Sequence, residues 1–312
     1  MRSWLLCVIL LIWSNSLFSW GFKPHRIINK HAVLLLPTPL FDFFKKHIEY
    51  ISSHSTEPDQ RRYIDSNEAP KHYIDIEFFI GIDSIPIFYK AANSKWGEDL
   101  LNNHGSVPWT VYFTIHKLKT AFIEQNAELI LKHSAELGHY VADLHVPLHT
   151  TKNYNGQLTN QHGIHKLWET EVAELYHEYP FLPNEISYLE NPMDSIWKWM
   201  WESHNQVNNV MECEIKCRKN EGFIITKSYH QNQKGLMSIK NTVNFIKDYE
   251  NCLRLKVYKR MEESIQHVAS CIYTSWILAG QPTLPNSEEI SELPIRRINE
   301  SINFHEHGSC HH

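Results

Sequence analysis

Apolar residues recur at intervals of three and four positions along most of this chain, which is the spacing of one face of an α-helix. After Pro39 the pattern runs from Leu40 to Ile51. It returns between Ile164 and Tyr176, and again between Ile246 and Ile272, which Gly280-Gln281-Pro282 follows. We therefore predict a helix over each of these three segments.

Alternation typical of strands is scarce, and residues 73–80 are the main candidate. Loops are predicted at residues 102–107, 153–163 and 217–234. No internal repeat or linker divides the chain. We predict an all-α fold, a single mostly helical domain over residues 20–284, followed by a flexible, His-containing tail over residues 285–312.

Composition narrows the class of protein further. The chain has 312 residues, of which 42% are hydrophobic, which supports a buried core and excludes a disordered or low-complexity protein. Length alone favours about two domains as a prior. The net charge of −5 provides no basic coat for duplex nucleic acid. Histidine, with 21 residues, outnumbers glycine and proline, so its placement decides whether the chain binds metal.

The amino terminus resembles a secretory signal. Residues 4–13 form an unbroken apolar run of ten, too short to span a bilayer but suited to a signal-peptide core. We predict a signal peptide over residues 1–19, with cleavage after Ser19, although Leu17 is larger than the residue preferred three positions before a cut. An uncleaved amphipathic start is the alternative. The mature protein is expected to be an exported monomer, periplasmic or extracellular, with no membrane span.

Cysteine usage leaves the disulfide pattern open. Cys7 lies in the signal, and the remaining five residues are an odd number, so at least one is a free thiol or pairs between chains. They are Cys213, Cys217, Cys252, Cys271 and Cys310.

The densest group of metal-ligand residue types lies between Gly138 and His149. On a helix, His139 and Asp143 project from the same face, so an imidazole nitrogen and a carboxylate oxygen can converge on one cation. Pro147 is expected to end or kink this helix, which aims His149 elsewhere. A His-x-x-x-Asp pair is also common on solvated helices, so further donors are needed to indicate a metal site.

A second pair with the same spacing, His165 and Glu169, lies beside the apolar face predicted for residues 164–176. Four further potential donors precede both pairs: the amino group of the presumed first mature residue, Trp20, and the side chains of His25, Asp59 and His72. A terminal amine has an unperturbed pKa of about 7.7–8.0, so a metal can readily hold its neutral form. Together these residues favour metal binding over unrelated surface groups.

In this order, the donors resemble those of the superfamily of zinc-dependent phospholipases C and single-strand-specific zinc nucleases. The matching stretches are Trp20-Gly21-Phe22-Lys23-Pro24-His25, Asp59 with His72, His139-x-x-x-Asp143, His149 and His165-x-x-x-Glu169. They cover about half of the chain, and the stretch from His139 to His149 is highly specific. The C-terminal half is similar only in being helical.

The resemblance implies three zinc ions in a cleft among the helices. The first would be held by Asp59, His72, His139 and Asp143. The second would be held by the amine and carbonyl of Trp20, His25 and the shared Asp143, so it requires signal cleavage before Trp20. The third, more open ion would be held by His149, His165 and Glu169.

Such a site suits phosphodiesters. Three Zn²⁺ ions with three carboxylates and a hydroxide leave an excess of roughly two positive charges for an anionic phosphate. Zinc lowers the pKa of its bound water to about 7, so we expect a zinc-bound hydroxide to attack phosphorus while the third zinc stabilises the leaving oxygen. The chain is therefore expected to be an enzyme, a zinc-dependent phosphoric diester hydrolase.

Two side chains are candidates for catalytic roles. The resemblance suggests that Asp59 accepts a proton from the nucleophile as well as binding metal. Arg62, three residues later, matches a phosphate-contacting arginine of the nuclease branch, and its fork would stabilise charge on the phosphate. The alternative is that Arg62 is an ordinary surface charge.

The sequence features favour more than one class of substrate. The five-residue spacing from Trp20 to His25 resembles the nuclease branch, whereas the sixteen residues from His149 to His165, with Glu169 as the last donor, resemble the phospholipase branch. Tyr154 could stack on a base or contact a choline cation. We expect phospholipase C-like hydrolysis of a phospholipid headgroup, with a single-strand nuclease or 3′-nucleotidase as the alternative.

A hypothesis of another class is a non-catalytic zinc-binding protein of the envelope. The tail from His305 to His312, which includes Cys310, favours it because His- and Cys-rich ends chelate metal without a fold. A metal buffer does not need ligands spread over 150 residues in a particular order, which favours the hydrolase.

Overall fold

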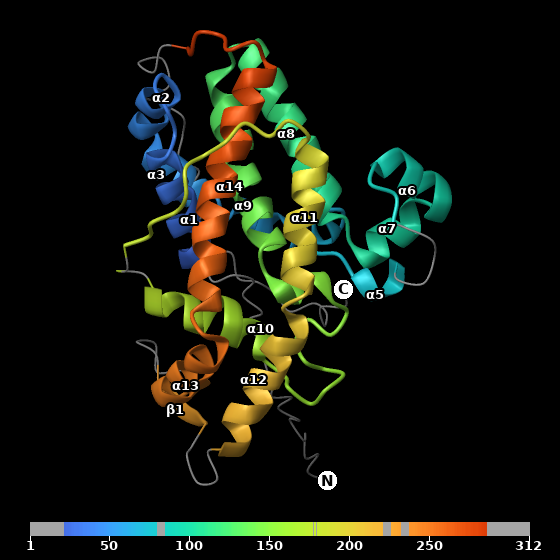
Figure 1. Cartoon of the computed structure of the whole chain (residues 1–312), viewed down its shortest axis with the longest axis vertical. Helices are drawn as coiled ribbons and strands as arrows, with labels where there is room; N and C mark the ends of the chain where they lie inside the picture. The colour runs from blue at the N-terminus through green and yellow to red at the C-terminus, as the bar shows by residue number, and fades with distance from the viewer. Residues whose placement is uncertain are drawn as a thin grey trace, which may run out of the picture.

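Long helices lying alongside one another form the centre of the molecule in a computed structural model, which describes residues 22–79, 85–176, 178, 180–220, 226–231 and 237–285 (Figure 1). They are α1 (Phe22–Leu34), α8 (Val107–Ile123), α9 (Ala127–Leu144), α11 (Pro192–His204) and α14 (Lys256–Leu278). Helix α8 packs on α9, and α14 contacts α1, α8 and α9. Their apolar faces form one hydrophobic core, which confirms the predicted all-α fold.

Shorter elements surround these helices. The α-helices are α2 (Leu40–Lys46), α3 (Ile48–His54), α4 (Glu57–Arg61), α5 (Ile76–Phe79), α6 (Tyr89–Trp96), α7 (Glu98–His104), α10 (Ile164–Lys166), α12 (Val207–Asn220) and α13 (Val243–Leu253). The tighter or wider turns are the 3₁₀ helices η1 (Ala69–His72), η2 (Pro147–Thr150) and η4 (Ala173–Tyr176) and the π-helix η3 (Leu167–Val172). Strands β1 (Lys227–Gln231) and β2 (Met237–Asn241) pair as an antiparallel hairpin.

Two of the predicted helices are broken. The segment 40–51 is divided at His47 into α2 and α3, and the segment 246–272 is divided into α13 and α14. At the second break Arg254 and Leu255 have φ values of 54° and 60°, in the left-handed region. Because the apolar spacing continues in phase across both breaks, periodicity alone predicts a continuous helix.

The predicted strand over residues 73–80 is wrong. Only Ile74 makes a bridge, to Gly105, among the described residues of that segment, and α5 begins at Ile76. The predicted loops at 102–107 and 217–234 are partly helix and strand, since α7 reaches His104, α12 reaches Asn220 and β1 begins at Lys227. The loop predicted over residues 153–163 is a series of turns, as expected.

Several predictions fall outside the described residues, namely the signal peptide, Trp20, and the tail including His305 and Cys310. Within the described part of the chain, no helix combines the length and apolar character needed to cross a bilayer.

Candidate functional site

Helix α9 supplies the centre of the site. His139 and Asp143 lie one turn apart near its end, and both are fully buried. The helix ends at Leu144, ahead of Pro147, and the following turn η2 carries His149, as the sequence predicted. The amphipathic face of α9 therefore fixes two potential ligands against the core, and the proline fixes the direction of the third.

The two oxygens of Asp143 face different groups of histidines. Oδ2 lies 2.8 Å from Nδ1 of His72 and 3.2 Å from Nε2 of His139. Oδ1 lies 3.5 Å from Nε2 of His25 and 3.4 Å from Nδ1 of His149. A carboxylate in this position can bridge two cations, which is the shared role that the resemblance implies for Asp143.

Asp59 completes the first donor set, defined as Asp59, His72, His139 and Asp143. It lies in α4, and its Oδ1 is 3.7 Å from Nδ1 of His72 and 3.8 Å from Nε2 of His139. The ligand atoms of His25, Asp59 and His139 are also within 4.8 Å of one another. The first donor set and His25 therefore form one continuous cluster. The sequence predicted His25 as a ligand of the second ion.

The third donor set consists of His149, His165 and Glu169. Glu169 Oε2 lies 3.2 Å from Nε2 of His149 and 3.0 Å from Nε2 of His165, and the two imidazole nitrogens are 2.9 Å apart. The predicted spacing of His165 and Glu169 is retained even though the chain changes from α10 to the π-helix η3 between them. The side chain of His165 is 17% exposed, so this set is more open than the first.

A close contact between helices α1 and α9 positions His25. A Cβ added at Gly138 would lie 1.9 Å from Oδ1 of Asn29, so only glycine allows the helices to approach this closely. Asn29 Nδ2 donates a hydrogen bond to the carbonyl of His25, 3.0 Å away. The His25 ring then stacks on that of His139, with centroids 4.0 Å apart.

These residues fit a metal centre because several of their carboxylate oxygens are buried without a hydrogen-bond donor, and a bound cation would compensate them. Among the described residues, both oxygens of Asp59, Oδ1 of Asp143 and both oxygens of Glu169 are buried without a hydrogen-bond partner. Buried carboxylates are costly unless cations compensate them. Carboxylate oxygens and imidazole nitrogens within a few ångströms of one another are the ligands of structural and catalytic zinc sites. The clusters could therefore hold metal ions.

Electrostatics differ between the parts of the cluster. Burial lowers the pKa of His25 to about 3 and of His165 to about 4, so both are neutral and able to ligate at neutral pH. Burial also opposes the protonation of His139, but the carboxylates of Asp143 and Asp59 outweigh it and raise its pKa to about 8. Burial raises the pKa of Glu169 to about 7. Cations in the donor sets would favour the ionised carboxylate.

Residues that the sequence analysis missed orient the histidines. His139 Nδ1 lies 2.8 Å from the carbonyl of Ser55, which can only accept, so Nδ1 carries a proton and Nε2, which faces the carboxylates, is the nitrogen that would ligate a cation once its own proton is displaced. Glu68 faces Nε2 of His72 at 3.7 Å, on the other side of the ring from Asp143. Outer carboxylates and carbonyls of this kind fix the tautomer and direction of metal-binding histidines.

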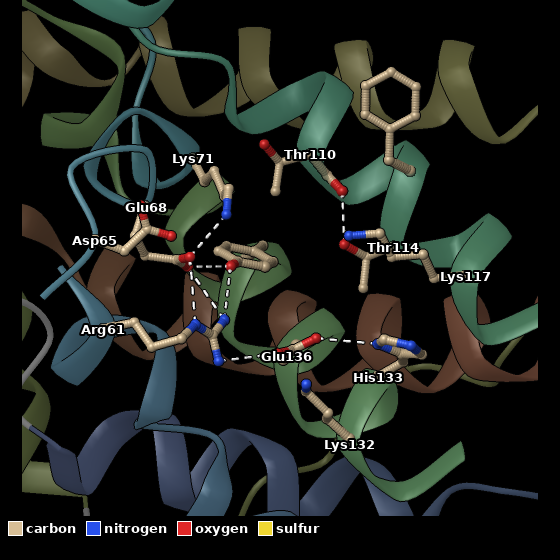
Figure 2. Close-up of a pocket in the computed structure, with 12 residues that line it drawn as sticks. Arg61, Asp65, Glu68, Lys71, Thr110, Thr114, Lys117, Lys132, His133 and Glu136 are labelled. Carbon is tan, nitrogen blue, oxygen red and sulfur yellow. Dashed lines mark hydrogen bonds and ion pairs between the residues drawn. The ribbon is translucent and has the colours of Figure 1, made fainter. Parts of the chain in front are cut away.

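A network around Glu68 holds that carboxylate in place (Figure 2). Its oxygens accept hydrogen bonds from Lys71 at 2.8 Å, from Arg61 at 3.3 Å and from the hydroxyl of Tyr140. Arg61 in turn pairs with Glu136 at 2.9 Å. Glu68 precedes His72 by four residues, the same spacing as the ligand pairs, and this was the signal in the sequence that could have identified it.

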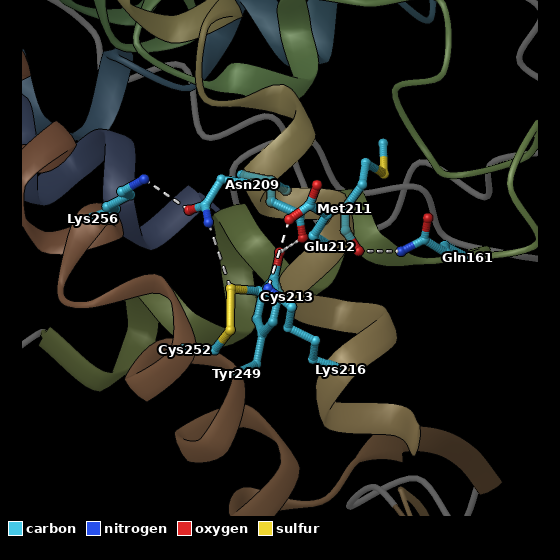
Figure 3. The surroundings of a disulfide bond; sticks show 10 residues. Gln161, Asn209, Met211, Glu212, Cys213, Lys216, Tyr249, Cys252 and Lys256 are labelled. Carbon is cyan, nitrogen blue, oxygen red and sulfur yellow. Dashed lines mark hydrogen bonds and ion pairs between the residues drawn. A yellow bond between two sulfur atoms is a disulfide. The ribbon is translucent and has the colours of Figure 1, made fainter. Parts of the chain in front are cut away.

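The loop over residues 151–163 lies beside the third donor set and is anchored to α12. Gln161 Nε2 donates to the carbonyl of Met211 at 2.8 Å and to Glu214 at 2.7 Å. A disulfide between Cys213 and Cys252 joins α12 to α13 at the same place (Figure 3). At the other end of the loop, the Tyr154 ring packs edge-on against His165, with centroids 5.6 Å apart.

The structure thus brings together the predicted side chains on seven elements: His25, Asp59, His72, His139, Asp143, His149, His165 and Glu169. Arg62 lies beside them, with Nη1 3.5 Å from Asp59 Oδ1. Trp20 lies outside the described residues. Comparison of the chain with protein-family models and with curated proteins finds no match.

Proposed function

We propose that this protein is an exported zinc-dependent phosphodiester hydrolase of phospholipase C type. The observation that carries the proposal is the position of Asp143, whose two oxygens face His72 and His139 on one side and His25 and His149 on the other. Since His149 also faces Glu169, the donor sets form one extended site. Such an extended site suits the phosphate of a diester better than a single isolated cation does.

Zinc in these donor sets would supply positive charge for the phosphate and a water of lowered pKa. The first ion would be held by Asp59, His72, His139 and Asp143, and the third by His149, His165 and Glu169. His25 and Asp143 would hold the second together with the mature amino terminus at Trp20. The donor chemistry of imidazole nitrogens with carboxylate oxygens favours zinc over magnesium or calcium, which prefer oxygen alone.

Two charged side chains of the chain can act on the substrate. Arg62 contacts Asp59, and its charge also contributes to the low pKa of His165. Its Nη1 lies 3.5 Å from Oδ1 of Asp59, at the edge of the first donor set. From this position its guanidinium can bind a phosphate oxygen and stabilise charge in the transition state, while Asp59 can hold a proton taken from the nucleophile.

A side chain of the loop beside the third donor set indicates which substrate the site could bind. Tyr154 packs on the partly open His165, where its ring could contact a choline headgroup by a cation–π interaction. The same ring could stack on a nucleobase, and this supports a single-strand nuclease or 3′-nucleotidase as the second candidate.

A parallel assay tests the proposal. Purified mature protein is given bis-p-nitrophenyl phosphate, phosphatidylcholine, single-stranded DNA and 3′-nucleotides, with and without a chelator. We expect cleavage of the synthetic diester and of phosphatidylcholine, loss of both on chelation, and recovery with zinc. Asp143→Asn should abolish activity, whereas Asp248→Asn, at an exposed position on α13, should leave it unchanged. Activity that survives chelation, or an Asp143→Asn variant as active as wild type, would contradict the proposal; cleavage of nucleic acid alone would select the second candidate.

A further inference from the structure

The β1–β2 hairpin presents large apolar side chains to solvent. Tyr229 and Ile239 lie directly opposite each other in the antiparallel pair, and Met237 lies on the same face two residues before Ile239. These residues are 75%, 50% and 61% exposed, respectively. Val243, which follows at the start of α13, is 60% exposed. Exposed apolar side chains gathered in this way mark an interaction surface.

The strands of the hairpin carry cations but no carboxylate. Lys227 and Lys240 are their charged residues, and neither strand contains Asp or Glu, whereas the net charge of the whole chain is −5. Lys227 and Lys240 on the strands are exposed, as is Lys219 in the last turn of α12, which ends near the hairpin at one end of the molecule (Figure 1). Exposed cations beside exposed apolar side chains complement an anionic lipid surface.

The base of the hairpin is attached to the candidate site. Asn241, the last residue of β2, donates a hydrogen bond from Nδ2 to Oε2 of Glu171 at 2.6 Å. Glu171 lies in η3, two residues after Glu169 of the third donor set, and α13 packs against the same helix. A surface that binds the hairpin would therefore lie against an element that directly contacts the more open end of the site.

We propose that the β1–β2 hairpin docks this protein on anionic lipid surfaces, with Tyr229, Met237 and Ile239 entering the boundary between headgroups and acyl chains and Lys227 and Lys240 contacting the headgroups. The inference deepens the proposed phospholipase activity and rests on it for its biological meaning. It makes the substrate class a phospholipid presented in a membrane rather than a dissolved phosphodiester.

Vesicle co-sedimentation of the mature, zinc-loaded protein, which lacks the apolar run at residues 4–13, tests the inference. The probes are vesicles of phosphatidylcholine alone and of phosphatidylcholine with about 30% phosphatidylserine. We expect wild-type protein to bind the anionic vesicles more tightly. The triple variant Tyr229→Ser/Met237→Ser/Ile239→Ser should have a partition coefficient for these vesicles that is lower by about tenfold or more. Lys227→Gln/Lys240→Gln should lose the preference for anionic vesicles.

The matched control is Ile123→Ser, which removes a 55% exposed apolar side chain at the end of α8, a helix end remote from the hairpin (Figure 1). It should bind vesicles like wild type. All variants should cleave bis-p-nitrophenyl phosphate at the wild-type rate. This activity also shows that they are folded. The hairpin variants should be slower only in cleaving phospholipid presented in vesicles.

Two results would overturn the inference: wild-type protein that does not sediment with either vesicle, or a triple variant that binds as well as wild type. The proposed function fails separately, because absence of activity on the soluble diester in wild-type protein contradicts the hydrolase and leaves the sedimentation result unaffected. An interaction of the hairpin with a protein instead of a lipid would give the first of these results.

Discussion

Glu68 is a buried carboxylate whose surroundings make it a positioning residue for His72. It faces Nε2 of His72 and is itself held by Lys71, Arg61 and Tyr140. Glu68→Gln keeps the size of the side chain but removes the charge that favours a proton on Nε2. Because outer-shell carboxylates contribute to ligand direction and basicity, we expect zinc affinity to fall about tenfold or more, measured by competition with a chromophoric chelator.

Lys71→Gln is the matched control for this prediction. It removes one partner of Glu68 whose side chain is 36% exposed, and leaves the carboxylate facing His72. Its zinc affinity should stay close to that of wild type. An unchanged affinity in Glu68→Gln would show that the carboxylate has no part in orienting His72.

At the same scale, the sequence indicated which side chains cluster far better than it indicated the groups that surround them. His139 and Asp143, like His165 and Glu169, are recognisable because two ligand types share one helical face. The carbonyl of Ser55 carries no sequence signal at all, since every residue has one and only the fold selects which carbonyl meets His139. Such contacts depend on how α3 and α9 pack and cannot be predicted from local spacing.

At the scale of elements, the packing of α1 on α9 determines where His25 lies. Gly138→Ala would place a methyl group 1.9 Å from the present position of Asn29 Oδ1, so the two helices must separate or Asn29 must move. Overpacking of this kind costs about 1–3 kcal/mol. We expect a loss of this size in the free energy of unfolding and a lower zinc content, measured by denaturant titration and elemental analysis.

A second substitution distinguishes the clash from any other effect of Gly138→Ala. Asn29→Ala removes the side chain that the new methyl group meets, so the double variant should regain zinc content relative to Gly138→Ala alone. If the double variant is no better than the single variant, the close approach of α1 and α9 is not what positions His25.

Helix α13 carries a buried carboxyl group with a pH-dependent effect on stability. Glu250 accepts a hydrogen bond from Tyr176 in η4, and its other oxygen has no hydrogen-bond partner among the described residues. Burial raises its pKa from 4.5 to about 7. The folded protein therefore retains this proton up to about pH 7, whereas the unfolded chain releases it near pH 4.5, so this group's contribution to stability falls as pH rises through that window.

Glu250→Gln removes the titration while keeping an acceptor for Tyr176. Relative to wild type, the variant should be little changed in stability at pH 5 and more stable at pH 8, by at most about 3 kcal/mol. Denaturant unfolding at both pH values measures the difference. A variant that is less stable than wild type at pH 8 would show that the ionised carboxylate is stabilised, not penalised, where it lies.

The sequence predicted elements well where an apolar face continues unbroken, as in α14, and poorly where tertiary contacts end an element. The break at Arg254 and Leu255 leaves the apolar spacing in phase on both sides. The segment after Tyr73 alternates like a strand, but its backbone instead bonds to distant carbonyls, with Asp75 N 2.7 Å from the carbonyl of His104. The β1–β2 hairpin falls in a stretch whose polar residues predicted a loop.

At the scale of the whole molecule, the donor sets connect α1, α4, η1, α9, η2, α10 and η3, so metal binding and folding should be coupled. Each ion bound at about a thousand times its dissociation constant adds about 4 kcal/mol to stability. Treatment with a strong chelator should lower the melting temperature by roughly 10 °C or more, and zinc but not magnesium should restore it. A melting temperature that chelation does not change would argue against metals held by the buried donors.

The most direct test of the central claim, a polynuclear zinc site built on Asp143, is the metal content of purified mature protein measured by elemental analysis on a sample of known concentration. The account predicts three zinc ions per chain in wild type, with a marked loss in Asp143→Asn and no loss in the surface control Asp248→Asn. Wild-type protein that holds no zinc after incubation with the metal, or an Asp143→Asn variant that retains all three ions, would contradict it.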